Sequence, residues 1–388
     1  MSRLDTVRPS LVGLFLAAAA ATVSWFLRWW LFGSATPTGD AGMYLDLARG
    51  IEPAPPWSFH VLTPWIAGTL FPDQPARGFL LVGAVSFVGA AAAIERVLAL
   101  MDSSGRERAL GVALFLVSST GAMMARQYLL VDALSYCLLG WSCVWALQGR
   151  DLRLAACIAV GVLNRETALF VAPVWFWINR GRGGAIVPRA VGVFLPAAVL
   201  YLVLHHTPIL FAHPPAHLNY LSPQGIAQLW RANLRWLGTS HRAYGFAICV
   251  VMAYGPVWLL ATRSTLAAVR EPSAIRSRRL LALWTLAAPT AFALAVGVDW
   301  RRGFQPLFVP VITSAVLSLR SCAPSRWWVL ATVTVVATAA VTEAWWHPPM
   351  GPTVVVSLTL WALTAAGVSW AEEVAGRSRA PGRAAALS

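Results

Sequence analysis

Lysine is absent from this sequence of 388 residues, and charged residues of any kind are scarce. Asp, Glu, Lys and Arg together make up 12% of the chain and hydrophobic residues 58%, whereas a soluble domain carries about a quarter charged residues. This composition excludes a water-soluble globular protein. All 30 basic residues are Arg, and most lie in short segments between apolar runs. The net charge of +14 therefore indicates a membrane orientation signal and not a nucleic-acid-binding face.

Cysteine is rare as well. Four of the five Cys residues lie inside apolar runs, no pair has the spacing of metal ligands, and an odd count argues against a disulfide framework. The sequence also lacks a nucleotide-binding loop, a nucleophile elbow and a nucleic-acid-binding module. These absences exclude nucleic acid as a partner and direct attention away from soluble phosphate donors.

The apolar runs are long enough to cross a hydrocarbon core of about 30 Å. They predict an all-α fold, a polytopic transmembrane helical bundle of about 11 to 13 helices with short interfacial helices in its outer loops. The predicted spans, about twelve crossings, are 11–32, 78–100, 108–124, 131–148, 154–163 with 168–179, 185–204, 244–262, 280–298, 304–319, 327–346 and 353–370.

The predicted organisation is a single transmembrane domain over 1–370 followed by a disordered, basic tail over 371–388. The loops on one side of the predicted spans carry about nineteen Arg residues and those on the other about ten, so the positive-inside rule predicts cytoplasmic termini. Two outer loops, 33–77 and 205–243, are too long to be turns. Long loops are usually functional, so the site is expected on the outer face.

The first outer loop contains two short helical patterns. In one, Thr38 is the expected N-cap and Gly50 the expected end. A helix of that length cannot span, so we expect it to lie along the outer interface. The other pattern, 59–71, is apolar but has only about 13 residues, which indicates a re-entrant or interfacial helix.

Asp40 begins the first of these helices, and Tyr44 follows one turn later. A carboxylate there is either a catalytic group or a simple N-terminal residue that favours the helix dipole. Asp132, next to the apolar run 133–147, has the same two readings, and they remain open.

Two further polar groups interrupt apolar runs. Asn164-Arg165-Glu166-Thr167 lies between two half-length apolar segments, where it either lines a cavity at membrane depth or forms a solvated turn. Asp299-Trp300-Arg301-Arg302-Gly303 places two adjacent Arg residues on the side opposite the Arg-rich loops. Guanidinium groups bind phosphate oxygens in pairs, so a lipid phosphate is the expected partner, and a solvated turn is the alternative.

Histidines crowd the second outer loop, but they do not form a zinc-hydrolase motif. His213 and His217 have the interval of such a motif, yet two prolines and no Glu lie between them. No metal ligands are therefore predicted, although a divalent metal is not excluded, and no cofactor is assigned.

Over about residues 10 to 320 the sequence resembles the GT-C superfamily of integral-membrane glycosyltransferases. The resemblance depends on short motifs in a common order and topology. These are Gly39-Asp40-x-x-x-Tyr44, Ala48-Arg49-Gly50, Phe59-His60-Val61-Leu62-Thr63-Pro64, Val131-Asp132-Ala133-Leu134, Asn164-Arg165-Glu166-Thr167 and Asp299-Trp300-x-Arg302. His60 departs from the pattern, since related bacterial sequences tend to have Arg there.

The resemblance implies transfer of a sugar from a polyprenyl-phosphate donor to a hydroxyl of a lipid, glycan or protein acceptor at the outer face of the membrane. By position, Asp40 becomes the catalytic base. In this chemistry Arg301 or Arg302, together with Arg165, would hold the phosphate, and Glu166 would orient Arg165 or a sugar hydroxyl. The expected substrate-binding residues are Tyr44, Arg49, His60, Asp132, Arg165, Glu166, Asp299, Arg301 and Arg302. Abundant Ala, Arg, Gly and Trp without Lys suggests a bacterial cytoplasmic (inner) membrane protein.

A secondary transporter or flippase for a lipid-linked or anionic substrate is the alternative. Such proteins also gather broken helices and buried charges. The transporter hypothesis predicts inverted repeats and polar sites midway across the membrane. The two halves of this sequence show no convincing self-similarity. A scaffold subunit with a decayed site is a third reading.

Overall fold

The computed structural model describes residues 39–51, 59–206, 240–296, 300–320 and 324–346, together with the isolated positions 224, 227, 228, 230–232, 235, 322 and 359. These residues form helices joined by short turns, and the described part of the chain contains no strand. The all-α prediction is therefore confirmed for it. The predicted spans 11–32 and 353–370, most of the loop 205–243 and the tail 371–388 lie outside the described residues.

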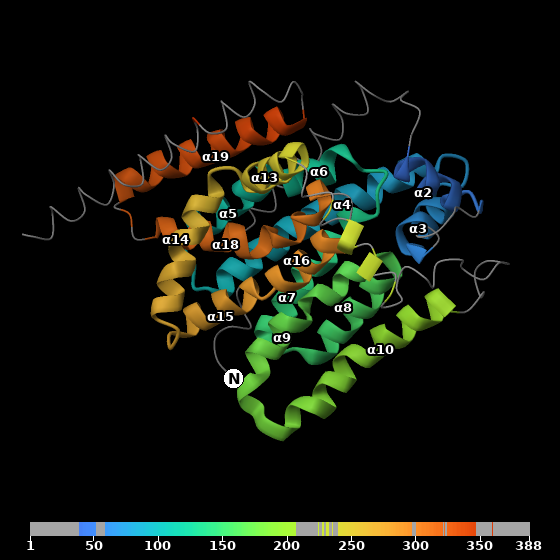
Figure 1. Ribbon diagram of the computed structural model, residues 1–388, viewed down its shortest axis with the longest axis horizontal. Helices are drawn as coiled ribbons and strands as arrows, with labels where there is room; N and C mark the ends of the chain where they lie inside the picture. Colours follow the sequence, from blue (N-terminus) through green and yellow to red (C-terminus); the bar gives the residue numbers. More distant parts are fainter. Residues whose placement is uncertain are drawn as a thin grey trace, which may run out of the picture.

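From α3 to α10, and again from α13 onward, the helices follow one another with few intervening residues (Figure 1). In chain order they are α2 (Asp40–Ala48), α3 (Leu62–Leu70), α4 (Pro75–Leu100), α5 (Gly105–Val117), α6 (Ser119–Arg126), α7 (Asp132–Gln148), α8 (Asp151–Asn164), η3 (Glu166–Val171), α9 (Ala172–Asn179), η4 (Arg180–Ala185), α10 (Ile186–His206), α13 (Ser240–Tyr254), α14 (Val257–Arg270), α15 (Ile275–Trp284), α16 (Ala287–Val296), α17 (Trp300–Gly303), η5 (Gln305–Leu307), α18 (Phe308–Leu319) and α19 (Pro324–Trp346).

The centre of the molecule is formed by α4, α7 and α18. Phe87, Phe115 and Phe308, from α4, α5 and α18, form a chain of tilted ring contacts with centroids 5.5 and 5.7 Å apart. Gly140 of α7 allows close approach to α4, because a Cβ there would lie 2.9 Å from that of Ala93. Outside this centre, α10 packs on α8, and α19 packs on α5 and α13, so these two helices flank the bundle (Figure 1).

Two helices among the described residues are long and apolar enough to cross a membrane, Pro75–Leu100 and Gly183–Leu204. The number rises to four if each of two bent helix pairs counts as one span. The predicted spans 11–32 and 353–370 lie outside this count, and several other apolar runs are divided into shorter helices within the described residues.

The predicted spans 108–124, 244–262 and 280–298 are wrong as single helices. The first bends by 54° between α5 and α6, where Ser118 is extended and its side chain caps α6 by accepting from the Gly121 N–H at 3.3 Å. The second bends by 81° at Gly255, which has a φ of 50° and precedes Pro256. The third is divided between α15 and α16. By contrast, the predicted division of 154–179 is confirmed, since α8 ends at Asn164.

The two short helices predicted in the first outer loop are present as α2 and α3. Gly50 ends α2 as predicted: with φ of 78° it lets its own N–H and that of Ile51 donate to the Leu47 and Asp46 carbonyls, at 3.1 and 2.9 Å. At the other end Gly39 is the residue before the helix, and Thr38 lies outside the described residues.

Candidate functional site

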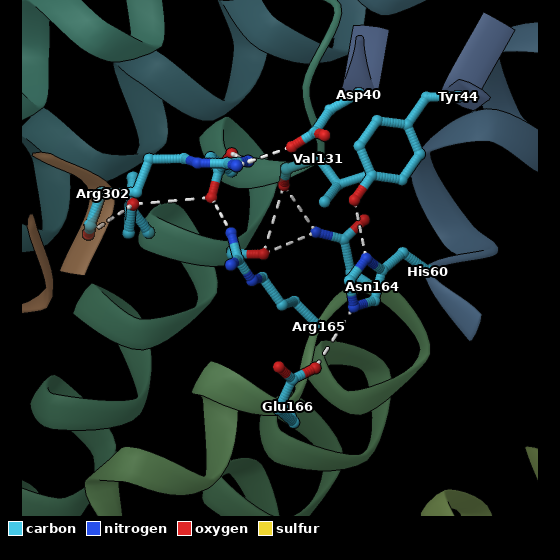
Figure 2. A network of polar contacts seen from close by, with 11 residues as sticks. Asp40, Tyr44, His60, Val131, Asn164, Arg165, Glu166 and Arg302 are labelled. Carbon is cyan, nitrogen blue, oxygen red and sulfur yellow. Dashed lines mark hydrogen bonds and ion pairs between the residues drawn. The ribbon is translucent and has the colours of Figure 1, made fainter. Parts of the chain in front are cut away.

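Polar side chains from four parts of the chain meet beside α2 (Figure 2). Asp40 lies at the start of α2, Asp132 at the start of α7, Arg302 in α17, and Arg165 at the break between α8 and η3. Three of these positions are helix ends. Side chains there can leave the helix axis and converge, which residues in the middle of packed helices cannot do.

Two arginines and two aspartates form a continuous chain of ion pairs. Arg302 Nη2 donates to Asp40 Oδ2 at 2.6 Å, and Arg302 Nη1 lies 3.7 Å from Asp132 Oδ2. Arg165 Nη1 donates to the other oxygen of Asp132. Asp132 therefore lies between the two guanidinium groups, and Arg302 lies between the two carboxylates.

This chain of charges is largely removed from solvent. Asp132 is 2% exposed, and the side chains of Arg302, Arg165 and Asp40 are 20%, 22% and 28% exposed. Burying an ion pair is costly unless each charge faces an opposite one. The alternation of guanidinium and carboxylate groups is the arrangement that lowers this cost.

A second chain of hydrogen bonds runs from α2 to Glu166 through His60. The Tyr44 hydroxyl lies 2.7 Å from His60 Nδ1, and His60 Nε2 lies 3.2 Å from Glu166 Oε2. Burial raises the pKa of Tyr44 well above its ordinary value, although the Arg165 guanidinium opposes this rise. The phenol thus stays protonated and donates to Nδ1, while Nε2–H donates to the half-exposed carboxylate of Glu166.

Asn164 holds the broken helix in place. Its Nδ2 donates to the Val131 carbonyl at 2.7 Å and to Ser135 Oγ at 2.8 Å. Its Oδ1 accepts from the backbone N–H and the hydroxyl of Thr63, at 3.2 and 2.6 Å. One fully buried amide thus joins α7, α3 and α8 directly behind Arg165.

Some buried polar atoms of the site lack a hydrogen-bond partner among the described residues. They are Asp132 Oδ2, Arg165 Nε and Thr167 Oγ1. Such atoms are uncommon in folded proteins, and each calls for a specific explanation. These three atoms belong to the start of α7 and to the break after α8, where the ion pairs of the site also meet.

The structure brings most of the predicted site residues together. The convergent residues are Asp40, Tyr44, His60, Asp132, Arg165, Glu166 and Arg302. Arg49 does not join them: it is 55% exposed and pairs with Asp46 at 3.6 Å, so its prediction as a substrate-binding residue is not supported. The side chain of Arg301 is outside the described part, and Asp299 lies outside the described residues.

Two roles differ from the sequence-based expectation. Asp132, predicted to bind substrate, is buried against Arg165 and accepts a long hydrogen bond of 3.5 Å from Tyr136. Glu166 is held by His60 and not by Arg165. Asn164 was noticed only as part of a motif, and Tyr136 was missed, although its position four residues after Asp132 puts both on one helix face.

The described residues contain no group of three or more His, Cys, Asp or Glu side chains that could hold a metal ion. The donors that converge here are guanidinium and imidazole groups, with the carboxylates already paired to them. Such a set suits a phosphate or a hydroxyl-bearing ligand better than a bare cation.

Comparison of the chain with known protein families, with curated proteins and with solved structures finds no match. The function must therefore be argued from the site itself.

Proposed function

We propose that this chain is an integral-membrane glycosyltransferase. It moves a sugar from a polyprenyl-phosphate-linked donor to an acceptor hydroxyl, with Asp40 as general base. The observation that carries this proposal is the contact of 2.6 Å between Asp40 and Arg302. This contact places a proton acceptor, Asp40, beside a phosphate-binding group, Arg302. Both side chains are more exposed than that of Asp132.

The reaction needs these two functions side by side. The acceptor hydroxyl oxygen forms a bond to the anomeric carbon and gives its proton to Asp40, while the bond between that carbon and the phosphate oxygen breaks. The phosphate leaves with the bonding electrons, and Arg302 stabilises its charge. Arg165, held by Asp132 at the break after α8, adds a second positive charge near the leaving phosphate.

The half-exposed carboxylate of Glu166 has a separate role in this proposal. Its side chain is 48% exposed, the largest exposure among the convergent acidic groups, and His60 fixes its direction. A carboxylate so oriented accepts hydrogen bonds from sugar hydroxyls. Tyr44 completes the support by holding His60 from α2.

The proposal includes a location and a fold type. A lipid-linked donor explains why the site would be built at an interface, beside the short helix α2. We propose a multi-pass GT-C-like bundle in a bacterial cytoplasmic membrane, with cytoplasmic termini and the site on the outer face. The apolar helices Pro75–Leu100 and Gly183–Leu204 support membrane insertion, and α10 exposes apolar residues such as Val187 and Leu195.

A transporter or flippase for an anionic or lipid-linked substrate is the second candidate. One observation favours it: α8 is broken beside a buried Asp132–Arg165 ion pair, and discontinuous helices with buried charges are typical of transporter binding sites. This alternative needs no general base, and Asp40 would then serve only to neutralise Arg302.

The deciding experiment measures turnover in nanodiscs. Purified protein is incubated with radiolabelled polyprenyl-phosphate sugars and a membrane-lipid extract as acceptor. Asp40→Asn is expected to lower transfer by about 10²–10⁴-fold, the usual contribution of a general base. Asp46→Asn is the matched control, because Asp46 lies on the same helix and its ion pair among the described residues is with the exposed Arg49.

The outcomes separate the candidates. Loss of transfer in Asp40→Asn, with full transfer in Asp46→Asn, supports the glycosyltransferase and its base. Full activity of a folded Asp40→Asn protein would remove Asp40 from the mechanism. If neither protein consumes a donor while labelled lipid crosses the bilayer, the transporter replaces the enzyme.

A further inference from the structure

One guanidinium in the site has two carboxylates within reach. Arg302 Nη2 hydrogen-bonds to Asp40 at 2.6 Å, while Nη1 lies 3.7 Å from Asp132 Oδ2. Charged hydrogen bonds of this kind measure about 2.7–2.9 Å, so the second contact is about an ångström too long. Arg302 thus engages Asp40 and stands next to an alternative partner.

The alternative partner, Asp132, has one carboxylate oxygen that accepts no hydrogen bond from the described residues. Asp132 Oδ1 accepts from Arg165 and, at 3.5 Å, from Tyr136. Asp132 Oδ2 is buried and accepts no hydrogen bond from the described residues. A buried carboxylate oxygen gains from any donor that reaches it, and among the described contacts the guanidinium of Arg302 is the donor that faces it.

We propose that Arg302 exchanges between Asp40 and Asp132, and that Asp132 is the positioning residue that draws it away from Asp40. This inference rests on the proposed function, in which Asp40 is the base. A carboxylate hydrogen-bonded to a guanidinium is a weaker proton acceptor than a released one. A shift of Arg302 by about an ångström completes the bond to Asp132 and releases Asp40 toward the acceptor hydroxyl.

The exchange leaves the phosphate-binding role of Arg302 intact. A guanidinium has five N–H donors in a planar fork, and a bond to Asp132 through Nη1 uses only one edge of it. The guanidinium keeps its full positive charge in either position. The base is therefore released without loss of the group that stabilises the leaving phosphate.

A purely structural role for Asp132 makes the opposite prediction. If Asp132 only supports Arg302 in its contact with Asp40, neutralising Asp132 loosens that contact and exposes Asp40. If Asp132 competes for Arg302, neutralising it leaves Arg302 on Asp40 and protects that carboxylate. Neutralising Asp132 therefore raises the accessibility of Asp40 if Asp132 has a supporting role and lowers it if Asp132 competes for Arg302.

Carbodiimide labelling measures this accessibility. The full chain in nanodiscs is treated with a water-soluble carbodiimide and an amine, without any sugar donor, and labelling is read by mass spectrometry. Asp46, on the same helix with 44% of its side chain exposed, is the internal reference. Relative to it, Arg302→Gln should raise labelling of Asp40 at least about fivefold, and Asp132→Asn should lower it about twofold or more.

Increased or unchanged labelling of Asp40 in folded Asp132→Asn would overturn the exchange. Asp132→Glu provides a second variant that keeps a negative charge beside Arg165 and extends the carboxylate toward Arg302. It should raise labelling of Asp40, and lowered or unchanged labelling would again contradict the proposal. Because no sugar donor is present, these outcomes stand apart from the transfer assay. If the transfer assay supports Asp40 as the base but the labelling results contradict the exchange, Asp40 keeps its role and only the proposed role of Asp132 is rejected.

Discussion

Two groups of ion pairs lie at opposite ends of α4, a helix of 26 residues and therefore about 40 Å long. The candidate site lies near its start, where α3 packs against Gly78. The other group, here called the turn cluster, follows its end and consists of Glu95, Glu107, Arg108 and Arg320. Both contain buried carboxylates paired with partly exposed arginines.

The turn cluster closes helix ends. Glu107 Oε2 accepts from the Ser104 N–H at 2.7 Å in a capping box, and from Arg320 at 3.0 Å. Arg276, from α15, donates to the Met101 carbonyl just after α4, at 3.1 Å. Glu107 is therefore anchored to a fixed backbone group as well as to Arg320, whereas Glu95 pairs with Arg108 through side chains, at 2.7 Å.

The charges of the candidate site are satisfied by one another instead. Arg302 has carboxylates on two sides, and Asp132 has guanidinium groups on two sides. Side chains can exchange such partners, whereas a backbone carbonyl at a helix end cannot move away. The comparison indicates that ion pairs anchored at helix ends serve stability, whereas a chain in which Arg302 and Asp132 each face two opposite charges can exchange partners and serve chemistry.

Arg302→Gln should give the largest effect, about a 10²–10³-fold loss of transfer rate, because charge on the leaving phosphate loses its partner. The initial rate with saturating donor measures it. Arg189→Gln is the matched control: Arg189 is similarly exposed and pairs with Asp151 on α8, away from the site. Equal losses of transfer rate in Arg302→Gln and Arg189→Gln would contradict a specific role of Arg302 in transfer.

Asn164→Leu should cost about 3 kcal/mol of unfolding free energy, since it leaves several buried donors and acceptors of α3 and α7 unpaired. Denaturant unfolding in mixed micelles measures this cost. Asn179→Leu is the control, because buried Asn179 makes one side-chain hydrogen bond within the described part of the chain, to the Trp175 carbonyl. A smaller loss of unfolding free energy for Asn164→Leu than for Asn179→Leu would contradict the role of Asn164 in joining α3, α7 and α8.

Arg320→Gln should have the smallest effect, about 2 kcal/mol of unfolding free energy, through lost charged hydrogen bonds to Glu107. The transfer rate per folded molecule should stay within about twofold of the wild type, because the turn cluster lies at the other end of α4. Unfolding and transfer are measured on the same preparation. A loss of transfer as large as in Arg302→Gln would erase the distinction between the two regions.

Much of the local structure could be predicted from the sequence. The end of α2 followed from Gly50, and the break in 154–179 followed from four polar residues between two apolar segments. The bends at Ser118 and Gly255 were missed. Apolar residues continue on both sides of these bends, and hydropathy averages carry no information about backbone dihedral angles.

The composition of the site was predicted better than its connections. Asp40 and Arg302 were both candidates, but their pairing joins positions 262 residues apart. His60 stood out only as a departure from a pattern, and the structure gives it two partners, Tyr44 and Glu166.

The amino-acid sequence is sufficient to predict apolar helices and to identify the few polar residues that interrupt the apolar runs. Helix formation and termination depend on residues within a few positions of one another, so they can be read from neighbours in the chain. The position of Arg302 between Asp40 and Asp132, and the pairing of Arg49 with Asp46, became known from the packed structure. Ion pairing depends on distances of a few ångströms between groups, and those distances are set by how the broken helices pack.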